Sequence, residues 1–173
     1  YCTLGSAAPL PCPGGTTAKA NVTMTSASDC DVCRRGVFCP VGSAEATPCA
    51  AGTFNNQPKQ KQCESCLPGT YQNESGATGC KPCPEGYYCA EASAAPLPCN
   101  DGSFSARTNL TSAGECMATE PGFFSLSGSS QQTACDVGTF TAVARSMYKG
   151  LKIAPSIALA NKINKRSWTQ RII

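Results

Sequence analysis

The chain has 173 residues, of which 14 are cysteine and none is histidine, and its formal net charge is +3 at pH 7. Residues 1–140 contain six Leu, five Val and no Ile, too few aliphatic side chains to offset the conformational entropy of ordering them. An ordinary hydrophobic core is therefore excluded, and the lack of histidine excludes the Cys–His pair and the commonest general base.

The sequence is built from short repeats. Residues 1–13 read YCTLGSAAPLPCP and residues 88–100 read YCAEASAAPLPCN, which are identical at nine of thirteen positions, and FCPVGSAEATPCA occupies residues 38–50. A finer unit, Cys-x-x-Gly with an aromatic residue two positions later, divides residues 1–140 into modules. In chain order the modules begin near residues 12, 33, 49, 66, 83, 99, 119 and 135. The module at 119 has threonine in place of its leading cysteine, and the first has Thr17 in place of the aromatic residue.

Each module is expected to form a tight turn and little else. Glycine allows the positive φ of such a turn, and Pro13, Pro68 and Pro84 preset φ at its entry. The aromatic residue is expected to lie over the adjacent disulfide and to supply most of the buried surface. A disulfide that closes a loop of about 15 residues contributes roughly 3 kcal/mol in the chain-entropy model. The sequence therefore predicts a small disulfide-rich fold, an elongated tandem array of short β-hairpins in which each module touches only its neighbours.

Residues 141–173 have a different composition. They contain no cysteine, all five Ile, the only Trp, and seven Lys or Arg without an acidic residue, whereas residues 1–140 carry seven basic and eleven acidic residues. Ser156 can cap a short helix from 157 to about 167, and the rest of this tail is expected to be disordered. One hypothesis is a basic segment for a membrane surface or a partner. Because the module at Cys135 breaks off after Phe140, we favour a product of splicing or of the gene model.

The cysteine pairing is predicted from what the module at 119 lacks. It has lost its leading cysteine, and the place near Gln132 where a second cysteine would fall is not cysteine either. Joint loss is expected if each disulfide joins two cysteines of one module. The predicted pairs are Cys12–Cys30, Cys33–Cys39, Cys49–Cys63, Cys66–Cys80, Cys83–Cys89 and Cys99–Cys116. An interlaced pattern, Cys83 with Cys99 and Cys89 with Cys116, stays open, because connectivity cannot be deduced from sequence alone.

Cys2 and Cys135 are left over. Cys2 matches Cys39 and Cys89, so its partner would fall six residues upstream, before Tyr1, and the partner of Cys135 would fall in the replaced tail. A leftover cysteine in a secreted chain pairs between molecules or stays reactive. We expect unpaired or intermolecular cysteines at both positions, because stacked modules would hold the two far apart.

The cysteine content also predicts the compartment. Fourteen cysteines in 140 residues are typical of a secreted, oxidised protein. Three N-glycosylation acceptors, Asn21, Asn73 and Asn109, lie in the wide loops between cysteines. The chain opens at Tyr1 without a signal peptide and has no apolar run of membrane length. We therefore expect an extracellular fragment of a longer secreted or cell-surface protein.

The alternation of modules resembles a known family. The stretch CLPGTYQNESGATGCKPCPEGYYCAEASAAPLPC is similar from end to end to an ephrin-receptor-like cysteine-rich repeat, and residues 1–140 resemble, more distantly, the cysteine-rich modules of tumour necrosis factor receptors. The resemblance implies a secreted or cell-surface binding or structural module without catalytic residues. Such repeats occur in receptors, adhesins and extracellular filaments, so the resemblance implies architecture more firmly than purpose.

Other kinds of site are less favoured. The spacing Cys63-x2-Cys66-x13-Cys80-x2-Cys83 is close to that of a four-cysteine zinc site, but it lies on the module grid, beside sequons and without any histidine. Cys30-x2-Cys33 has the spacing of a redox pair, but no βαβ pattern surrounds it. No metal, cofactor or catalytic residue is predicted. Arg34 and Arg35 are expected to point outward from a six-residue disulfide loop, where they can contact an acidic partner or glycan.

These observations leave two functions open. The first is a structural or adhesive scaffold, or protein-binding segment, of a large surface or matrix protein. The second is the ligand-binding stalk of a signalling receptor. The expected partners are a protein, a glycan or neighbouring repeats of the parent protein, and not nucleic acid; contact of the tail with a membrane surface is the least favoured.

Overall fold

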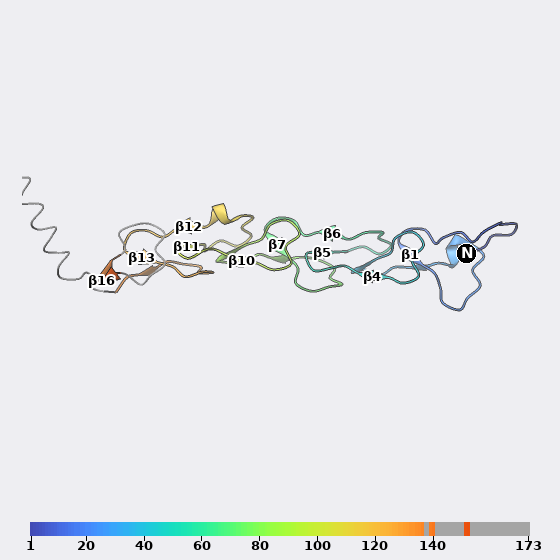
Figure 1. The fold of residues 1–173 in the computed structure, drawn as a ribbon, viewed down its shortest axis with the longest axis horizontal. Helices are drawn as coiled ribbons and strands as arrows, with labels where there is room; N and C mark the ends of the chain where they lie inside the picture. Colours follow the sequence, from blue (N-terminus) through green and yellow to red (C-terminus); the bar gives the residue numbers. More distant parts are fainter. Residues whose placement is uncertain (137–138, 141–150, 153–173) are drawn as a thin grey trace, which may run out of the picture.

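The computed structural model describes residues 1–136, 139–140 and 151–152, which form an elongated rod with the N-terminus at one end (Figure 1). Its regular structure is a series of two-residue strands, paired in antiparallel hairpins with one hairpin for each module, and two short 3-10 helices. The predicted fold class, a disulfide-rich tandem array of short hairpins, is confirmed.

The hairpins follow one another in chain order. They are β1 (Thr16–Thr17) with β2 (Asp31–Val32), β3 (Val37–Phe38) with β4 (Thr47–Pro48), β5 (Thr53–Phe54) with β6 (Glu64–Ser65), β7 (Thr70–Tyr71) with β8 (Lys81–Pro82), β9 (Tyr87–Tyr88) with β10 (Leu97–Pro98), β11 (Ser103–Phe104) with β12 (Met117–Ala118), β13 (Phe123–Phe124) with β14 (Thr133–Ala134), and β15 (Thr139–Phe140) with β16 (Leu151–Lys152). The 3-10 helices η1 (Ala27–Asp29) and η2 (Ala113–Glu115) directly precede Cys30 and Cys116.

The last hairpin takes its second strand from beyond residue 140. β16 lies within the segment that the sequence assigned to the basic tail, and it pairs with β15 in the register Phe140 to Leu151. The module at Cys135 therefore has a complete hairpin. The helix predicted at 157–167 lies outside the described residues, and the domain boundary at residue 140 stays a prediction.

Each hairpin starts directly after the turn glycine of its module. The turn glycines of the first seven modules have φ between 75° and 88°, a region that residues with a Cβ adopt rarely. Space excludes a side chain as well, because a Cβ on Gly36 would lie 2.2 Å from the carbonyl oxygen of Gly76. Gly76 belongs to the module at Cys66, which is two modules further along the rod. The prediction that each module touches only its neighbours is therefore wrong, since turns also pack against the second module along.

Four main-chain hydrogen bonds join each module to the next. They link the turn, the leading cysteine and the residue after the aromatic to the following module. Between the modules at Cys66 and Cys83 they run from Gly69 N–H to Cys89 O (2.8 Å), Cys83 N–H to Gly69 O (2.9 Å), Gln72 N–H to Ser93 O (3.0 Å) and Ala92 N–H to Cys66 O (2.9 Å). Equivalent bonds recur at every joint from the module at Cys12 to the module at Thr119. The ladder satisfies backbone polar groups that the short strands leave unpaired.

The ladder uses a second left-handed residue in each module. This residue donates its N–H to the carbonyl of the leading cysteine of the module before it, and it is Gly42, Lys59, Gly76, Ala92, Asn109 or Gly128. Lys59, Ala92 and Asn109 have φ of 63°, 56° and 61°. Because these three residues are not glycine, the sequence does not mark the position as a turn.

Cysteines form most of the core. Nine of the twelve buried hydrophobic residues are cysteines, and the others are Val37, Leu110 and Phe124. The aromatic residues that follow the turns are only partly buried, with Phe124 as the exception. Where the position after the aromatic is not cysteine, it is a buried polar residue in four modules, namely Asn55, Gln72, Ser105 and Ser125. The side-chain amide of Asn55 donates to the carbonyls of Val37 (3.0 Å) and Gln62 (3.2 Å), so it links neighbouring modules.

Candidate functional site

Six disulfides lie along the rod, each within one module. They join Cys12 to Cys30, Cys33 to Cys39, Cys49 to Cys63, Cys66 to Cys80, Cys83 to Cys89 and Cys99 to Cys116. Their Cα–Cα distances lie between 5.8 and 6.5 Å. The pairs are the same as those predicted from the sequence, and the interlaced alternative does not occur in the structure.

Among the described cysteines, Cys2 and Cys135 are free, Cys2 exposed and Cys135 partly so. Cys2 lies in a half-module, since residues 1–11 pair Tyr1 with Leu10 through two hydrogen bonds of 2.8 Å, as Tyr88 pairs with Leu97. The repeated phrase in the sequence thus has a repeated structure. The half-module and hairpin β13–β14, which Cys135 follows, lie near opposite ends of the rod (Figure 1).

The cysteines of the zinc-like spacing are all engaged in disulfides. Cys66 and Cys80 are bonded to each other, Cys63 to Cys49 and Cys83 to Cys89. A disulfide sulfur is not the thiolate that zinc binds. Within residues 1–136, 139–140 and 151–152, no group of three or more His, Cys, Asp or Glu side chains is placed to hold a metal ion.

The module at Thr119 has hydrogen bonds where the six modules before it have a disulfide. Thr119 is buried, and its hydroxyl donates to the carbonyl of Gly102 at 3.3 Å. The side-chain oxygen of Gln132 accepts the N–H of Glu120 at 2.9 Å. Gln132 therefore still bonds back to the turn of its module, but through a noncovalent contact.

Carboxylates close several loops. Hydrogen bonds from the backbone N–H groups of Thr25 and Ser26 lower the pKa of Asp29. The Thr111 hydroxyl and then the Thr111 backbone N–H lower the pKa of Glu115 at the equivalent place. Each carboxylate accepts hydrogen bonds that fix the chain just before the second cysteine of its module, so both have a structural role.

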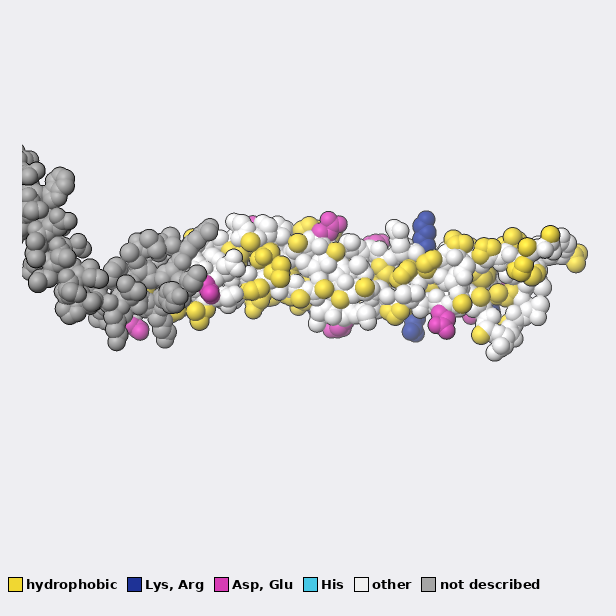
Figure 2. Space-filling view, in the orientation of Figure 1, with side chains coloured by type: hydrophobic (Ala, Val, Ile, Leu, Met, Phe, Trp, Pro, Cys, Tyr) yellow, Lys and Arg dark blue, Asp and Glu magenta, His cyan; other side chains and the backbone are white. Residues whose placement is uncertain are grey.

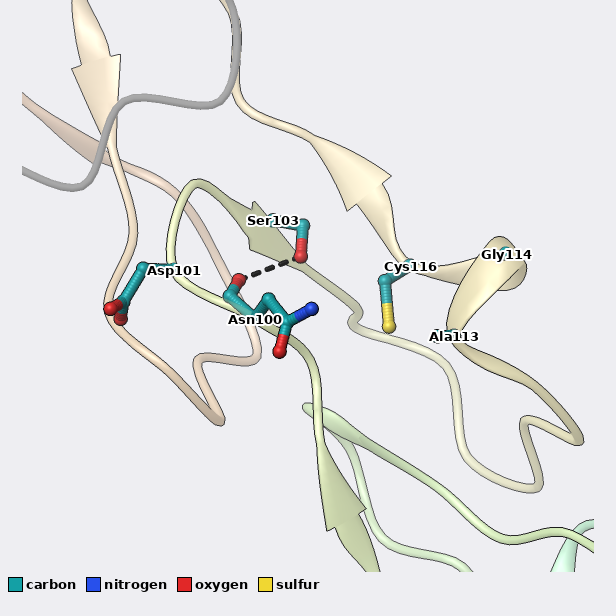
Figure 3. Close-up of a pocket in the computed structure, with 6 residues that line it drawn as sticks. All are labelled: Asn100, Asp101, Ser103, Ala113, Gly114 and Cys116. Carbon is teal, nitrogen blue, oxygen red and sulfur yellow. Dashed lines mark hydrogen bonds between the residues drawn. The ribbon is translucent and has the colours of Figure 1, made fainter.

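A hollow of about 290 Å³ lies in the module at Cys99 (Figure 3). It is lined by Asn100, Asp101, Ser103, Ala113, Gly114 and Cys116. The Ser103 hydroxyl donates to the Asn100 carbonyl at 2.7 Å, and the Asp101 carboxylate accepts the N–H of Ser127 at 2.6 Å. The hydroxyl and the carboxylate of the lining are thus each hydrogen-bonded to the backbone.

The residues predicted to contact a partner or to carry a glycan lie on the surface. Arg34 and Arg35 are both exposed in the Cys33–Cys39 loop, as the sequence predicted. Asn21, Asn73 and Asn109 are exposed as well, and Asn73 accepts a hydrogen bond of 2.8 Å from Lys81. Lys59 and Lys61, which sequence reasoning did not single out, are exposed in the next module. Aligning Lys59 with the glycines at 42 and 76 is the signal that would have drawn attention to it.

Two overlapping stretches of the chain match one family. Residues 36–79 and residues 52–96 each match the family described as tyrosine-protein kinase ephrin type A/B receptor-like. Residues 36–96 are therefore similar to ephrin-receptor-like repeats. The two matches begin at successive turn glycines, Gly36 and Gly52, so they differ by one module of the ladder. A comparison with curated proteins found no match.

The ephrin-receptor-like assignment carries a coarse functional meaning. The family is a cysteine-rich receptor-like repeat and not a known enzyme family. Together with the six disulfides, the match to this family indicates a protein-binding module outside the cell or at its surface. Among the described residues, no helix combines the length and the apolar composition needed to cross a membrane.

Proposed function

We propose that this chain is a non-enzymatic segment of an extracellular scaffold, with a structural or adhesive role in a larger surface or matrix protein. The observation that carries the proposal is the unbroken main-chain ladder, which repeats the same hydrogen bonds at every joint from the module at Cys12 to the module at Thr119. A ladder of this kind makes a spacer of fixed length, and each further module would lengthen it by the same step.

The disulfides support an extracellular place of work. Buried cysteines replace the aliphatic core in this fold, and disulfides persist in oxidising compartments. A reduced chain would lose the covalent closure of six loops, and few aliphatic contacts would remain to hold the ladder. We therefore propose that the chain folds and acts only where its cysteines are oxidised.

We also propose N-linked glycans on Asn21, Asn73 and Asn109. All three asparagines are exposed, so a glycan would extend into solvent without displacing a disulfide. Glycans on a rod would protect its main chain from proteases and would limit lateral association. Digestion of the secreted protein with an N-glycosidase should shift its mass, and Asn→Gln variants should assign the sites.

The alternative is the ligand-binding stalk of a signalling receptor. Both functions use the same rod, so they differ in the parts of the parent protein that the rod connects and not in the local chemistry of its modules. A scaffold would support attachment as a passive surface, whereas a receptor stalk would bind one soluble ligand with saturation.

The test uses the full chain, secreted from cells and purified in oxidised form. Peptide mapping should recover the six within-module disulfides, and small-angle scattering should give an elongated particle. Surfaces coated with the oxidised chain should support cell attachment, and coating with the reduced and alkylated chain should not. A chain that folds only in reduced, metal-bound form would refute the proposal. Attachment that is equal for both forms would also refute it.

A further inference from the structure

Four exposed cations lie in two adjacent modules, and we name them the basic collar: Arg34, Arg35, Lys59 and Lys61. In the described part of the chain, none of them forms an ion pair or a side-chain hydrogen bond. The rod's remaining cations before residue 137 all have acidic neighbours. Lys19 pairs with Asp31 at 3.4 Å and Lys81 with Glu74 at 2.8 Å. Arg107 acts on Glu115, whose pKa is lowered first by hydrogen bonds from Thr111 and also by the Arg107 charge.

The ladder brings the two halves of the collar together. Lys59 N–H donates to the carbonyl of Cys33 at 2.8 Å, and Cys39 N–H donates to the carbonyl of Gln60 at 2.9 Å. Residues 59–60 are thus hydrogen-bonded to both ends of the disulfide loop that carries Arg34 and Arg35. Segments about 25 residues apart in the sequence become adjacent through these two bonds.

Both segments are preorganised. The Cys33–Cys39 disulfide closes a loop with a sequence separation of six residues, and Lys59 is held at φ 63° by the ladder. Three of the equivalent positions in other modules are glycine, which suits this backbone region better than lysine does. A rigid backbone reduces the ordering entropy that binding would otherwise cost. The backbone that carries the four cations is therefore fixed before any partner arrives.

The collar is also where the charge of the rod changes sign. Residues 33–63 contain the four collar cations and a single acid, Glu45, whereas residues 64–136 contain eight acids and two basic residues. Figure 2 shows dark-blue side chains at one position along the length of the rod, at its upper and lower edges, and magenta ones at several positions along it. Because charges are screened over about 8 Å at physiological ionic strength, an approaching anion responds to the collar and not to the mean charge of the rod.

We propose that the basic collar binds a sulfated polysaccharide chain. A linear polymer with closely spaced sulfate groups can contact cations on two adjacent modules at once. The planar forks of Arg34 and Arg35 suit oxyanions, and the lysines add point charges beside them. The choice of ligand rests on the proposed extracellular role, because that is where such polysaccharides are found. The contact itself depends only on the oxidised fold.

The test measures heparin affinity of the oxidised full chain by surface plasmon resonance. The collar variant carries Arg34→Gln, Arg35→Gln, Lys59→Asn and Lys61→Gln, where asparagine is chosen because it tolerates the left-handed backbone. The control variant carries Lys81→Gln and Arg107→Gln. All proteins are also made with the seven basic residues of 141–173 replaced by glutamine, so that the tail does not mask the rod.

We expect the collar variant to bind about 10-fold or more weakly, and the control within about twofold of the parent. Desulfated heparin should bind as weakly as the collar variant does. Equal affinity of parent and collar variant would overturn the proposal, as would undiminished binding of desulfated heparin. Salt-sensitive dimers of the parent without heparin affinity would overturn it too, since the occupant would then be the acidic half of a second copy. Correctly paired disulfides in a chain that fails to bind heparin would leave the scaffold function standing while refuting the collar.

Discussion

The module at Thr119 should be the least stable part of the rod, and adding the missing disulfide should correct this. The change is the double variant Thr119→Cys and Gln132→Cys. Thr119 is buried at the position where Cys49, Cys66 and Cys99 are buried, so a cysteine fits there. The cysteines that would match position 132 are partly buried, as Gln132 is.

The expected gain follows from the contacts that are exchanged. A disulfide that closes a loop of roughly 15 residues adds about 3 kcal/mol in the chain-entropy model. The variant gives up the bonds from Thr119 to Gly102 and from Glu120 to Gln132, which contribute about 1 kcal/mol each. The local opening free energy should therefore rise by about 1 kcal/mol, or about fivefold in protection from exchange. Gln132→Ala should lower protection by about fivefold, because it loses one hydrogen bond without replacement.

The assay is hydrogen exchange followed by mass spectrometry. A peptide that covers residues 119–134 reports on the module, and a peptide from residues 66–82 serves as an internal reference. Gln131→Ala is the matched control, since Gln131 is exposed and adjacent to Gln132. The reasoning fails if residues 119–134 of the parent exchange as slowly as the reference. It also fails if the new disulfide forms without added protection.

Four further predictions follow from the same contacts. Gly36→Ala should destabilise the chain by more than about 2 kcal/mol, because its Cβ would meet a carbonyl oxygen at 2.2 Å in a left-handed turn; Gly79→Ala, with open space around it, is the control, and equal melting temperatures would contradict the packing. A mild reductant should unfold the chain and a chelator should not, which circular dichroism can follow; unfolding by chelator alone would reveal a structural metal. Because the folded-state pKa of Asp29 is lowered, the stability that its carboxylate contributes is present above the ordinary carboxyl pKa and is lost as pH falls through the folded value. Asp29→Asn should therefore reduce the fall of the melting temperature at acid pH, and it should leave the change in melting temperature between pH 7 and 5 unaltered. Purified chain should show two titratable thiols, from Cys2 and Cys135, or reductant-sensitive oligomers; a monomer without thiols would mean that the two ends meet.

The modules could be predicted because their signals are local. Glycine marks each turn, the residue two positions later closes the first strand, and the joint loss of cysteines at Thr119 and Gln132 pointed to pairing within modules. Each of these depends on residues that are close in the chain, where spacing reflects backbone geometry directly. The half-module at Cys2 could be recognised for the same reason, since it repeats the phrase around Cys89.

The contacts between modules could not be predicted. The approach of Gly36 to Gly76 joins modules that are not consecutive, and the left-handed backbone at Lys59 and Ala92 has no signature in the side chain. Both arise because the ladder satisfies backbone N–H and carbonyl groups, which every residue has, so the glycines at 42, 76 and 128 are the one trace that it leaves in the sequence. The sequence by itself therefore determined the module, the disulfide within it and its likeness to a family. Only the tertiary structure decided how modules stack, and with it the hydrogen bond from Lys59 to Cys33 that places residue 59 beside the Arg34 loop.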